Sequence, residues 1–316
     1  MQKKCPVLVI FAPTACGKTA FVTEMFGKSS LFPFKERAEV VCADSQTVYK
    51  GLNIGTAKPS ESETNEIPHH LLDLISPDVQ FGVGEFIENA DKICAEIFKR
   101  QKLPILVGGS GFYIKNFILG LPQTPPSDQK VRDSLKKRLE NEGNEKLYAK
   151  LQEVDPDYAK KISKNDFYRL LRALEVFEIS NRPLSSFKLP DKCREQYDFC
   201  TLILTRPREE LYARINERVE QMFKAGLPLE VEQLRKSGYT KESPGMKAIG
   251  YSEFFIPNYS QAQIKEKIKS HSRRYAKKQY TFMQEIPNAI KIPADDLQKL
   301  QYIIEDFCKK HLSLWN

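Results

Sequence analysis

The sequence predicts an α/β fold in which helices flank a parallel sheet and an all-helical domain is inserted into the chain. Short apolar runs alternate with segments of helical periodicity, which is typical of a parallel sheet. A Gly-Lys-Thr loop joins the first apolar run to the first helix. A helical stretch between two proline-rich segments interrupts the alternation, so we expect it to form a separate domain.

The first part of the chain contains three apolar runs of the length and composition of buried parallel strands. They are residues 6–11, 40–43 and 103–107, and helices are expected at 19–26 and 85–100. Each run is followed by a polar or glycine-rich loop, at 12–19, 44–47 and 108–111. Parallel strands end at one edge of their sheet, so we expect a site at that edge.

The middle of the chain has no strand periodicity. A rigid proline-rich segment at 121–128 opens it, and Asp128 is a candidate N-cap. Helices are predicted at 129–141, 145–153, 156–162 and 166–179, before a second proline-containing stretch at 182–190 and a strand at 199–205. The sequence therefore predicts an inserted helical domain at 122–198, and a core formed by 1–121 and 199–316.

The last third of the chain is predicted to be largely helical. Helical spacing indicates helices at 208–224, 229–236 and 261–284, a short strand at 289–292, and a closing helix at 296–311. Between positions 265 and 278 there are seven cationic residues and one acidic residue, and aromatic residues lie nearby at Tyr275, Tyr280 and Phe282. This pattern favours RNA binding over the alternative, a solvated helix face.

Composition excludes several classes of protein. Hydrophobic residues make up 41% of the 316 residues, which is enough for a sizeable core. The net charge of 49 − 41 = +8 favours a polyanionic partner. No apolar run approaches the roughly 18 residues of a membrane span. Seven scattered cysteines without CxxC spacing indicate neither zinc nor disulfides, so we expect a reduced cytoplasmic protein without a targeting segment.

The loop after the first strand matches the phosphate-binding pattern GxxxxGK[ST] at seven of the eight template positions. Backbone N–H groups, a lysine charge and a hydroxyl that can ligate Mg²⁺ would cradle a triphosphate or a pyrophosphate. The loop alone does not distinguish ATP from another such ligand. We expect it to bind through Ala12, Pro13, Thr14, Ala15, Cys16, Gly17, Lys18 and Thr19, with Thr19 as the magnesium ligand.

Asp44 follows the second predicted strand and has three possible roles. It could help to hold Mg²⁺, act as a general base that faces the phosphate loop, or cap a turn. Ser45, Gln46 and Thr47 follow it and offer hydrogen-bonding groups suited to reading the edge of a nucleobase. By contrast, we expect no metal at His69 and His70, because neighbouring residues on an extended segment point to opposite sides.

The chain resembles the bacterial tRNA dimethylallyltransferases, also called tRNA isopentenyltransferases, nearly from end to end. The most specific motifs are Gly-Thr-Ala-Lys-Pro at 55–59 and Ile-Pro-His-His-Leu at 67–71. Further matching segments lie at 13–19, 43–46, 48–51, 106–111, 172–176, 248–251 and 274–279.

The resemblance implies an enzyme with a P-loop core that transfers a dimethylallyl group from dimethylallyl diphosphate to N6 of an adenosine. The target adenosine is 3′-adjacent to the anticodon in tRNAs that read codons starting with U. It also implies that Asp44 is the base, and that Arg218 and Thr19, with Mg²⁺ as cofactor, assist at the diphosphate. We expect a monomer whose partners are the anticodon stem-loop of tRNA and dimethylallyl diphosphate, with no membrane.

The resemblance also implies a set of tRNA contacts, part of them in the inserted domain. They are Asp44, Ser45, Gln46, Thr47, Ser110, Arg132, Tyr168, Arg169, Leu170, Leu171, Arg172, Lys247, Ala248, Ile249, Gly250, Tyr251, Ser252, Lys277, Lys278, Gln279, Tyr280, Thr281, Phe282, Met283 and Gln284.

The sequence departs from the family pattern without losing a catalytic group. Ala12 replaces a glycine, Cys16 stands where serine is common, and Ser110 replaces a threonine but keeps the hydroxyl. Lys278, Phe282 and Gln284 replace Arg, Trp and Arg, so the RNA contacts there are the least secure. The Ala12 replacement is costly only if that position needs a positive φ.

Three other functions are compatible with parts of the pattern. A small-molecule P-loop kinase would turn over ATP without tRNA. A prenyltransferase of free adenine nucleotides would need neither a long basic helix nor a large inserted domain. A non-enzymatic P-loop RNA-binding switch would bind tRNA in a salt-sensitive manner without forming product.

Overall fold

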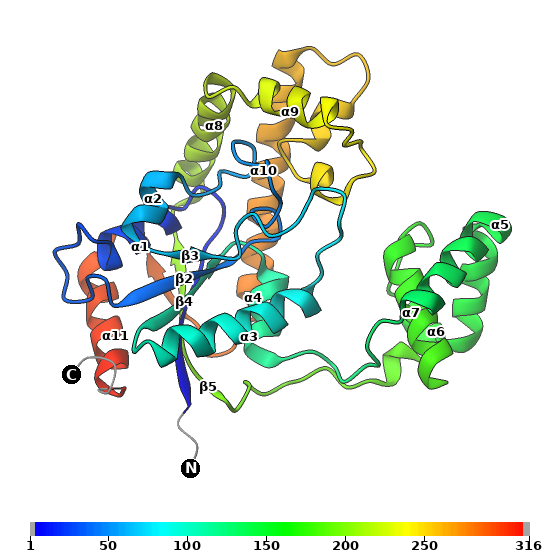
Figure 1. The fold of residues 1–316 in the computed structure, drawn as a ribbon, viewed down its shortest axis with the longest axis horizontal. Helices are drawn as coiled ribbons and strands as arrows, with labels where there is room; N and C mark the ends of the chain where they lie inside the picture. Colours follow the sequence, from blue (N-terminus) through cyan, green and yellow to red (C-terminus); the bar gives the residue numbers. More distant parts are fainter. Residues whose placement is uncertain (1–3, 312–316) are drawn as a thin grey trace. The chain divides into compact units, whose positions relative to one another are not determined.

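The computed structural model describes residues 4–311, and over that range its strands form one six-stranded sheet (Figure 1). Every neighbouring pair is parallel, and the strand order is β3-β2-β4-β1-β5-β6. The strands are β1 (Cys5–Phe11), β2 (Ala38–Ala43), β3 (His69–His70), β4 (Leu103–Gly108), β5 (Tyr197–Thr205) and β6 (Ile290–Pro293). The parallel sheet and the five strands predicted from apolar runs are confirmed; β3 was not predicted.

Helices follow the strands as βαβ connectivity requires. Helix α3 (Val83–Lys99) leads from β3 to β4 and packs on β1, β2 and β4. Its Phe86 stacks on Tyr113 and meets Phe117, both from α4 (Gly111–Leu119), and Phe117 in turn contacts Tyr197 of β5. The larger unit also contains α1 (Lys18–Phe26), α2 (Glu61–Glu66) and α11 (Leu297–Lys309).

Two of these helices were not predicted, for different reasons. Helix α2 has the sequence ESETNE and buries none of its residues, so it has no apolar periodicity. It depends instead on a capping box between Ser60 and Glu63. Helix α4 begins directly at Gly111, inside what the sequence suggests is a glycine-rich loop.

The chain divides into two compact units, residues 1–118 with 193–316 and residues 119–192. The smaller unit contains α5 (Gln129–Val154), α6 (Pro156–Ala159), α7 (Phe167–Ser180) and the short 3₁₀ helix η1 (Leu184–Ser186). Asp128 caps α5 by accepting hydrogen bonds from two backbone N–H groups. The positive φ of Gly143, 80°, breaks α5 where the sequence predicts a gap between two helices.

The smaller unit has its own hydrophobic core. Fully buried leucines from α5 and α7 form its centre, including Leu135, Leu147, Leu151 and Leu170. Its bounds differ from the predicted 122–198 because Arg194 belongs to the larger unit. The Arg194 backbone N–H donates to the carbonyl of Ile118, and its guanidinium pairs with Asp91 on α3.

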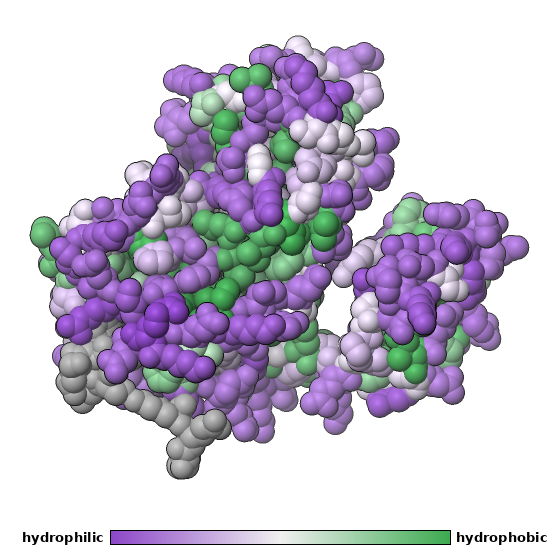
Figure 2. All heavy atoms as spheres, viewed as in Figure 1, coloured by the Kyte–Doolittle hydropathy of each residue, from purple (hydrophilic) through white to green (hydrophobic). Residues whose placement is uncertain are grey.

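The C-terminal part of the larger unit adds three helices beside the sheet. They are α8 (Arg208–Lys224), α9 (Leu227–Lys236) and α10 (Gln261–Met283), with the short 3₁₀ helices η2 (Pro244–Lys247) and η3 (Ser252–Phe255) between α9 and α10. Helices α8 and α10 pack against each other. The space-filling view in Figure 2 shows a band of hydrophobic residues across the middle of this unit, between hydrophilic margins.

Two expectations from composition concern the whole chain. Among residues 4–311, no helix is long and apolar enough to cross a membrane. All seven cysteines are free thiols, as expected for a reduced protein. Residues 1–3, which enter the expectation that the chain has no targeting segment, lie outside the described range.

Glu39 on β2 is a buried carboxylate held by an arginine, a lysine and a histidine. It accepts hydrogen bonds from Arg100 at 2.6 Å and His70 at 2.8 Å, and Lys102 lies 3.4 Å away. Burial raises the pKa of Glu39, but the hydrogen bonds from Arg100 and His70 outweigh it, so the pKa is lowered. The cluster ties β2, β3 and the end of α3 together.

We predict that Glu39→Gln lowers the free energy of unfolding at pH 7 by about 1–3 kcal/mol, because charge-assisted hydrogen bonds are lost. Because the pKa of Glu39 is lower in the folded protein, its carboxylate stabilises the fold at pH values above the unfolded-state pKa of about 4.3. That stabilisation is lost as the pH falls through the folded-state pKa. Urea denaturation should therefore show the two proteins converging below about pH 4. A constant difference down to pH 3 would contradict this account.

Candidate active site

The carboxyl ends of β1, β2 and β4 open into a cleft of about 1040 Å³. Residues of α8 and α10 line it as well. The strand ends lie close together because Gly108 has no side chain: a Cβ there would lie 1.9 Å from the carbonyl oxygen of Ala43. The cleft therefore lies at the edge of the sheet where the sequence predicts a site.

The phosphate loop occupies the end of β1. Two of its residues have positive φ, Ala15 at 60° and Gly17 at 104°, and Ala12 is not one of them. The Ala12 replacement therefore costs no backbone strain. Lys18 folds over the loop, and its ammonium group donates to the carbonyls of Ala12 and Pro13 at 3.0 and 3.1 Å.

The Cys16 side chain points away from the loop. It is fully buried, and its thiol lies 3.6 Å from the carbonyl oxygen of Leu204 on β5. Burial raises the pKa of this thiol. Cys16 therefore contributes its backbone to the loop and its side chain to the core, which is why cysteine can stand in place of serine.

Three arginines hold the phosphate loop from outside. Arg206 donates to the carbonyl of Cys16 at 2.8 Å, and Arg214 donates to the carbonyl of Ala15 at 2.9 Å. Arg218 donates to the hydroxyl of Thr14 at 3.4 Å. Burial and the neighbouring Arg218 together lower the pKa of Lys18 to about 8. The region is therefore strongly cationic and suited to a polyphosphate.

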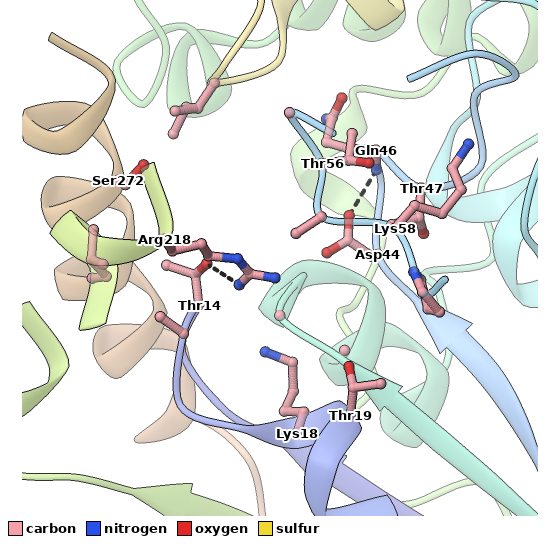
Figure 3. A pocket seen from close by; sticks show the side chains of 18 of the residues that line it. Thr14, Lys18, Thr19, Asp44, Gln46, Thr47, Thr56, Lys58, Arg218 and Ser272 are labelled. Carbon is pink, nitrogen blue, oxygen red and sulfur yellow. Dashed lines mark hydrogen bonds between the residues drawn. The ribbon is translucent and has the colours of Figure 1, made fainter. Parts of the chain in front are cut away.

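Asp44 faces Lys18 and Arg218 across the cleft (Figure 3). One carboxylate oxygen, Oδ1, accepts a hydrogen bond from the backbone N–H of Gln46 at 2.9 Å. The other, Oδ2, accepts none from any residue in the described range. In Figure 3, Asp44 and Arg218 point into the same space, and Lys18 and Thr19 approach it from the start of α1. Asp44 is near enough to Arg218 to raise its pKa, against the larger lowering by burial.

Ser110 holds the backbone on either side of Asp44. Its hydroxyl accepts from the backbone N–H of Ser45 at 3.0 Å, and its own N–H donates to the carbonyl of Ala43. Ser110 is buried, so the structure gives it a role in holding the loop after β2.

One wall of the cleft was not predicted as part of the site. It is the segment 55–59, and Glu230 of α9 fixes its start by accepting backbone N–H groups of Asn53 and Ile54. The hydroxyl of Tyr251 donates to Glu230 at 2.6 Å and accepts from the N–H of Gly55 at 3.1 Å. The specific motif at 55–59 signalled this segment, but the positioning role of Glu230 depends on a contact between residues far apart in sequence.

Lys58 belongs to the same wall and is nearly buried. Its ammonium group contacts the carbonyl of Tyr49 at 2.8 Å, the side chain of Asn53 at 2.9 Å and the carboxylate of Asp73. With three partners of its own, Lys58 fixes the fold of the wall.

The structure divides the expected tRNA contacts into four groups. Asp44, Ser45, Gln46, Thr47, Lys247, Ala248 and Ile249 line the cleft. Arg132, Tyr168, Arg169, Leu170, Leu171 and Arg172 belong to the smaller unit. Lys277, Lys278, Thr281 and Gln284 are exposed on or just after α10, and Tyr280 and Phe282 are half-buried there. Gly250, Tyr251 and Ser252 follow η2.

Seven side chains among the expected contacts are buried, namely Thr47, Ser110, Leu170, Ala248, Tyr251, Gln279 and Met283. Thr47, Ala248 and Gln279 nevertheless line the cleft. Leu170 is in the core of the smaller unit, Tyr251 is fully buried beside Glu230, and Met283 on α10 is 2% exposed. Leu170, Tyr251 and Met283 do not line the cleft, so these three side chains support neighbouring surfaces.

Arg132 and Arg172 meet at a buried carboxylate within the smaller unit. Glu175 pairs with Arg172 at 2.8 Å and with Arg132 at 3.5 Å. Arg172 also donates to the hydroxyl of Thr124 and the carbonyl of Pro125. Arg172 therefore ties the proline-rich segment to α7, in addition to any contact with tRNA.

The histidines form no metal site with other residues. His69 lines the cleft, with its Nδ1 2.7 Å from the carbonyl oxygen of Ile67, and His70 contacts Glu39. Within residues 4–311, no group of three or more His, Cys, Asp or Glu side chains could hold a metal ion.

Comparison with known proteins identifies one family. The model of the IPP transferase family matches residues 47–286. A tRNA dimethylallyltransferase of Syntrophotalea carbinolica is 38% identical over 311 residues, which cover 97% of each chain. That match includes the phosphate loop and Asp44, which precede the segment matched by the family model.

Solved structures agree. A tRNA isopentenylpyrophosphate transferase from Bacillus halodurans is similar with a TM-score of 0.67 and 32% identity, over 98% of this chain and 97% of that one. A eukaryotic dimethylallyltransferase described as acting on tRNA has a TM-score of 0.77 and 25% identity, over 96% of this chain and 80% of that one.

Gln279 connects α10 to two strand ends. Its side-chain oxygen accepts the backbone N–H of Thr14 at 2.9 Å, and its side-chain nitrogen donates to the carbonyl of Gly109 at 2.8 Å. We predict that Gln279→Leu lowers the free energy of unfolding by about 1–3 kcal/mol, because the Thr14 N–H loses its acceptor and the Gly109 carbonyl keeps the Tyr275 hydroxyl at 3.2 Å but loses the amide.

Urea denaturation measures that loss, and amide hydrogen exchange at Thr14 should accelerate in the same variant. Gln279→Glu is the matched control, since it keeps the acceptor for Thr14 but not the donor to Gly109. An unchanged Thr14 exchange rate in Gln279→Leu would show that the phosphate loop does not depend on α10.

Proposed function

This chain belongs to the IPP transferase family, and from that premise we propose the reaction that its cleft carries out. The protein is a tRNA-modifying prenyltransferase. We propose that it transfers a dimethylallyl group from dimethylallyl diphosphate to N6 of the adenosine 3′-adjacent to the anticodon, in tRNAs that read codons starting with U. The observation that carries the proposal is that the phosphate loop and Asp44 open into one cleft.

Asp44 is the proposed general base. The exocyclic amine of adenine is a weak nucleophile, because its lone pair is delocalised into the ring. It needs a base that takes its proton as the new bond forms. Atom Oδ1 of Asp44 is engaged by Gln46 and Oδ2 is available to accept that proton. The bond between N6 and the allylic carbon forms, the bond between that carbon and the diphosphate oxygen breaks, and the proton moves to Asp44.

The phosphate loop and Arg218 are proposed to stabilise the departing diphosphate. Backbone N–H groups at the start of α1, the ammonium group of Lys18 and the guanidinium of Arg218 converge on the space opposite Asp44. Preorganised positive charge at a developing anion is usually the largest single contribution to catalysis.

Thr19 suits the proposed Mg²⁺. Its hydroxyl lines the cleft in the first turn of α1. Mg²⁺ prefers oxygen ligands and is commonly held by one or two protein groups together with substrate phosphates. A site with one hydroxyl and no cluster of carboxylates among the described residues fits that preference. When bound, the ion would neutralise charge on the diphosphate.

The tRNA is proposed to bind across the cleft as a substrate of a monomeric enzyme in the cytoplasm. Anticodon-loop bases are accessible, and a base can be unstacked and turned into a pocket for a few kcal/mol. Lys277 and Lys278 are exposed beside the cleft-lining part of α10, which supports contact with the phosphate backbone.

The direct test is the incorporation of labelled dimethylallyl diphosphate into unmodified tRNA in the presence of Mg²⁺, with labelled ATP in a parallel reaction. We expect label in the tRNA and no release of phosphate from ATP. Turnover of ATP without prenyl transfer would instead establish a kinase. Salt-sensitive binding of tRNA without product would establish a binding protein.

We predict that Asp44→Asn reduces turnover by roughly 10²- to 10⁴-fold, the usual effect of removing a general base. The amide keeps an acceptor for the Gln46 N–H, so the loop should stay in place. Affinity for tRNA should change by no more than a few-fold. Single-turnover kinetics and a tRNA binding assay measure the two effects. Near-normal turnover would exclude Asp44 as the base.

A further inference from the structure

Arg214 is a cationic residue of the cleft that the sequence motifs do not assign. It lies on α8 one turn before Arg218, and side chains four residues apart share a helix face. Both arginines line the cleft. The two guanidinium groups are close enough that the charge of Arg214 lowers the pKa of Arg218.

The guanidinium of Arg214 lies directly against the phosphate loop. Its Nε donates to the carbonyl of Ala15 at 2.9 Å, which fixes the side chain in place. A Cβ added at Gly17 would lie 3.8 Å from its Nη2, and 3.8 Å from Nη2 of Arg206. Nε of Arg214 is thus used to hold the loop, while its Nη2 lies beside the glycine where the loop turns into α1.

Arg214 differs from Arg206, the other arginine that holds a loop carbonyl. The charge of Arg206 is balanced by Glu210 at 2.6 Å, and Arg206 lines a separate hollow. Arg214 forms no salt bridge with any residue of the described range. An unpaired guanidinium with free amino groups at a phosphate loop fits an oxyanion of a diphosphate, which guanidinium groups bind with two parallel hydrogen bonds.

We propose that Arg214 binds the diphosphate of the prenyl donor together with Arg218. This inference rests on the proposed function, since it names a further residue of the same site. As the carbon–oxygen bond of the donor breaks, its electron pair stays on the diphosphate oxygen, and Arg214 stabilises the charge that develops there. Arg214 thereby acts on the leaving group and has no part in proton transfer to Asp44.

The test is a comparison of Arg214→Gln with the wild type in calorimetric titrations with inorganic pyrophosphate and Mg²⁺. Glutamine can still donate an amide hydrogen to the carbonyl of Ala15, so the substitution mainly removes the charge. We expect pyrophosphate to bind on the order of 10- to 100-fold more weakly, the equivalent of one charge-assisted hydrogen bond. The KM for dimethylallyl diphosphate should rise, and the affinity for tRNA should stay within about two-fold.

Arg208→Gln is the matched control. It removes one exposed charge from the same helix, but Arg208 does not line the cleft. Its pyrophosphate affinity should match the wild type. Equal weakening in both variants would show a general effect of net charge and would overturn the proposal.

Arg214→Lys separates binding from loop support. If Arg214 binds the diphosphate through its charge, the lysine variant should recover part of the affinity that the glutamine variant loses. If both variants lose affinity equally and amide exchange in the loop accelerates equally, Arg214 merely supports the loop and the proposal is wrong. Arg214→Gln with wild-type pyrophosphate affinity would also overturn it.

The outcome is distinguishable from failure of the proposed function. A wild-type protein that transfers the prenyl group while Arg214→Gln keeps full pyrophosphate affinity refutes the role of Arg214 alone. A wild-type protein that neither binds pyrophosphate nor prenylates tRNA refutes the function itself.

Discussion

The close parallel pairing of β2 with β4 is the constraint on which the site depends. Register brings Ala43 opposite Gly108, and the absence of a Cβ at Gly108 lets the two backbones approach. Since β1 pairs with β4 on its other side, the loops after all three strands open at one edge of the sheet. The phosphate loop and Asp44 come from different strands, so neither could face the other if this register shifted by even one residue.

The helices after β5 add walls to that edge and make it a cleft. Helix α10 reaches both strand ends through the buried amide of Gln279, and α8 contributes the arginines at the phosphate loop. Exposed lysines also lie on α10, on the surface proposed to contact tRNA. A rigid connection between Gln279 and Thr14 therefore couples the surface proposed for tRNA to the loop proposed for the diphosphate. Such coupling would help an enzyme whose two substrates react only when both are bound.

Local patterns were enough to predict the strands other than β3, and the phosphate loop, because apolar runs and glycine spacing determine these features within a few residues. The sequence also placed Asp44 at a strand end, and two helices in α5 that Gly143 separates. It could not predict that Gln279 is buried, since nothing near it shows that its amide will meet Thr14, 265 residues away in sequence. The same holds for Glu230, whose carboxylate looks like that of any solvated helix residue until the fold brings it to residues 53–55.

The charges of the cleft bear on why the proposed base and the cations lie on opposite sides. Burial and the nearby charge of Arg218 lower the pKa of Lys18 to about 8, and burial and the nearby charge of Arg214 lower the pKa of Arg218. A bound diphosphate would neutralise part of this positive charge. The resulting gain in free energy would contribute to the affinity for the donor. In the proposed reaction, Asp44 hydrogen-bonds to its own loop and accepts a proton, while the cations across the cleft stabilise the leaving group.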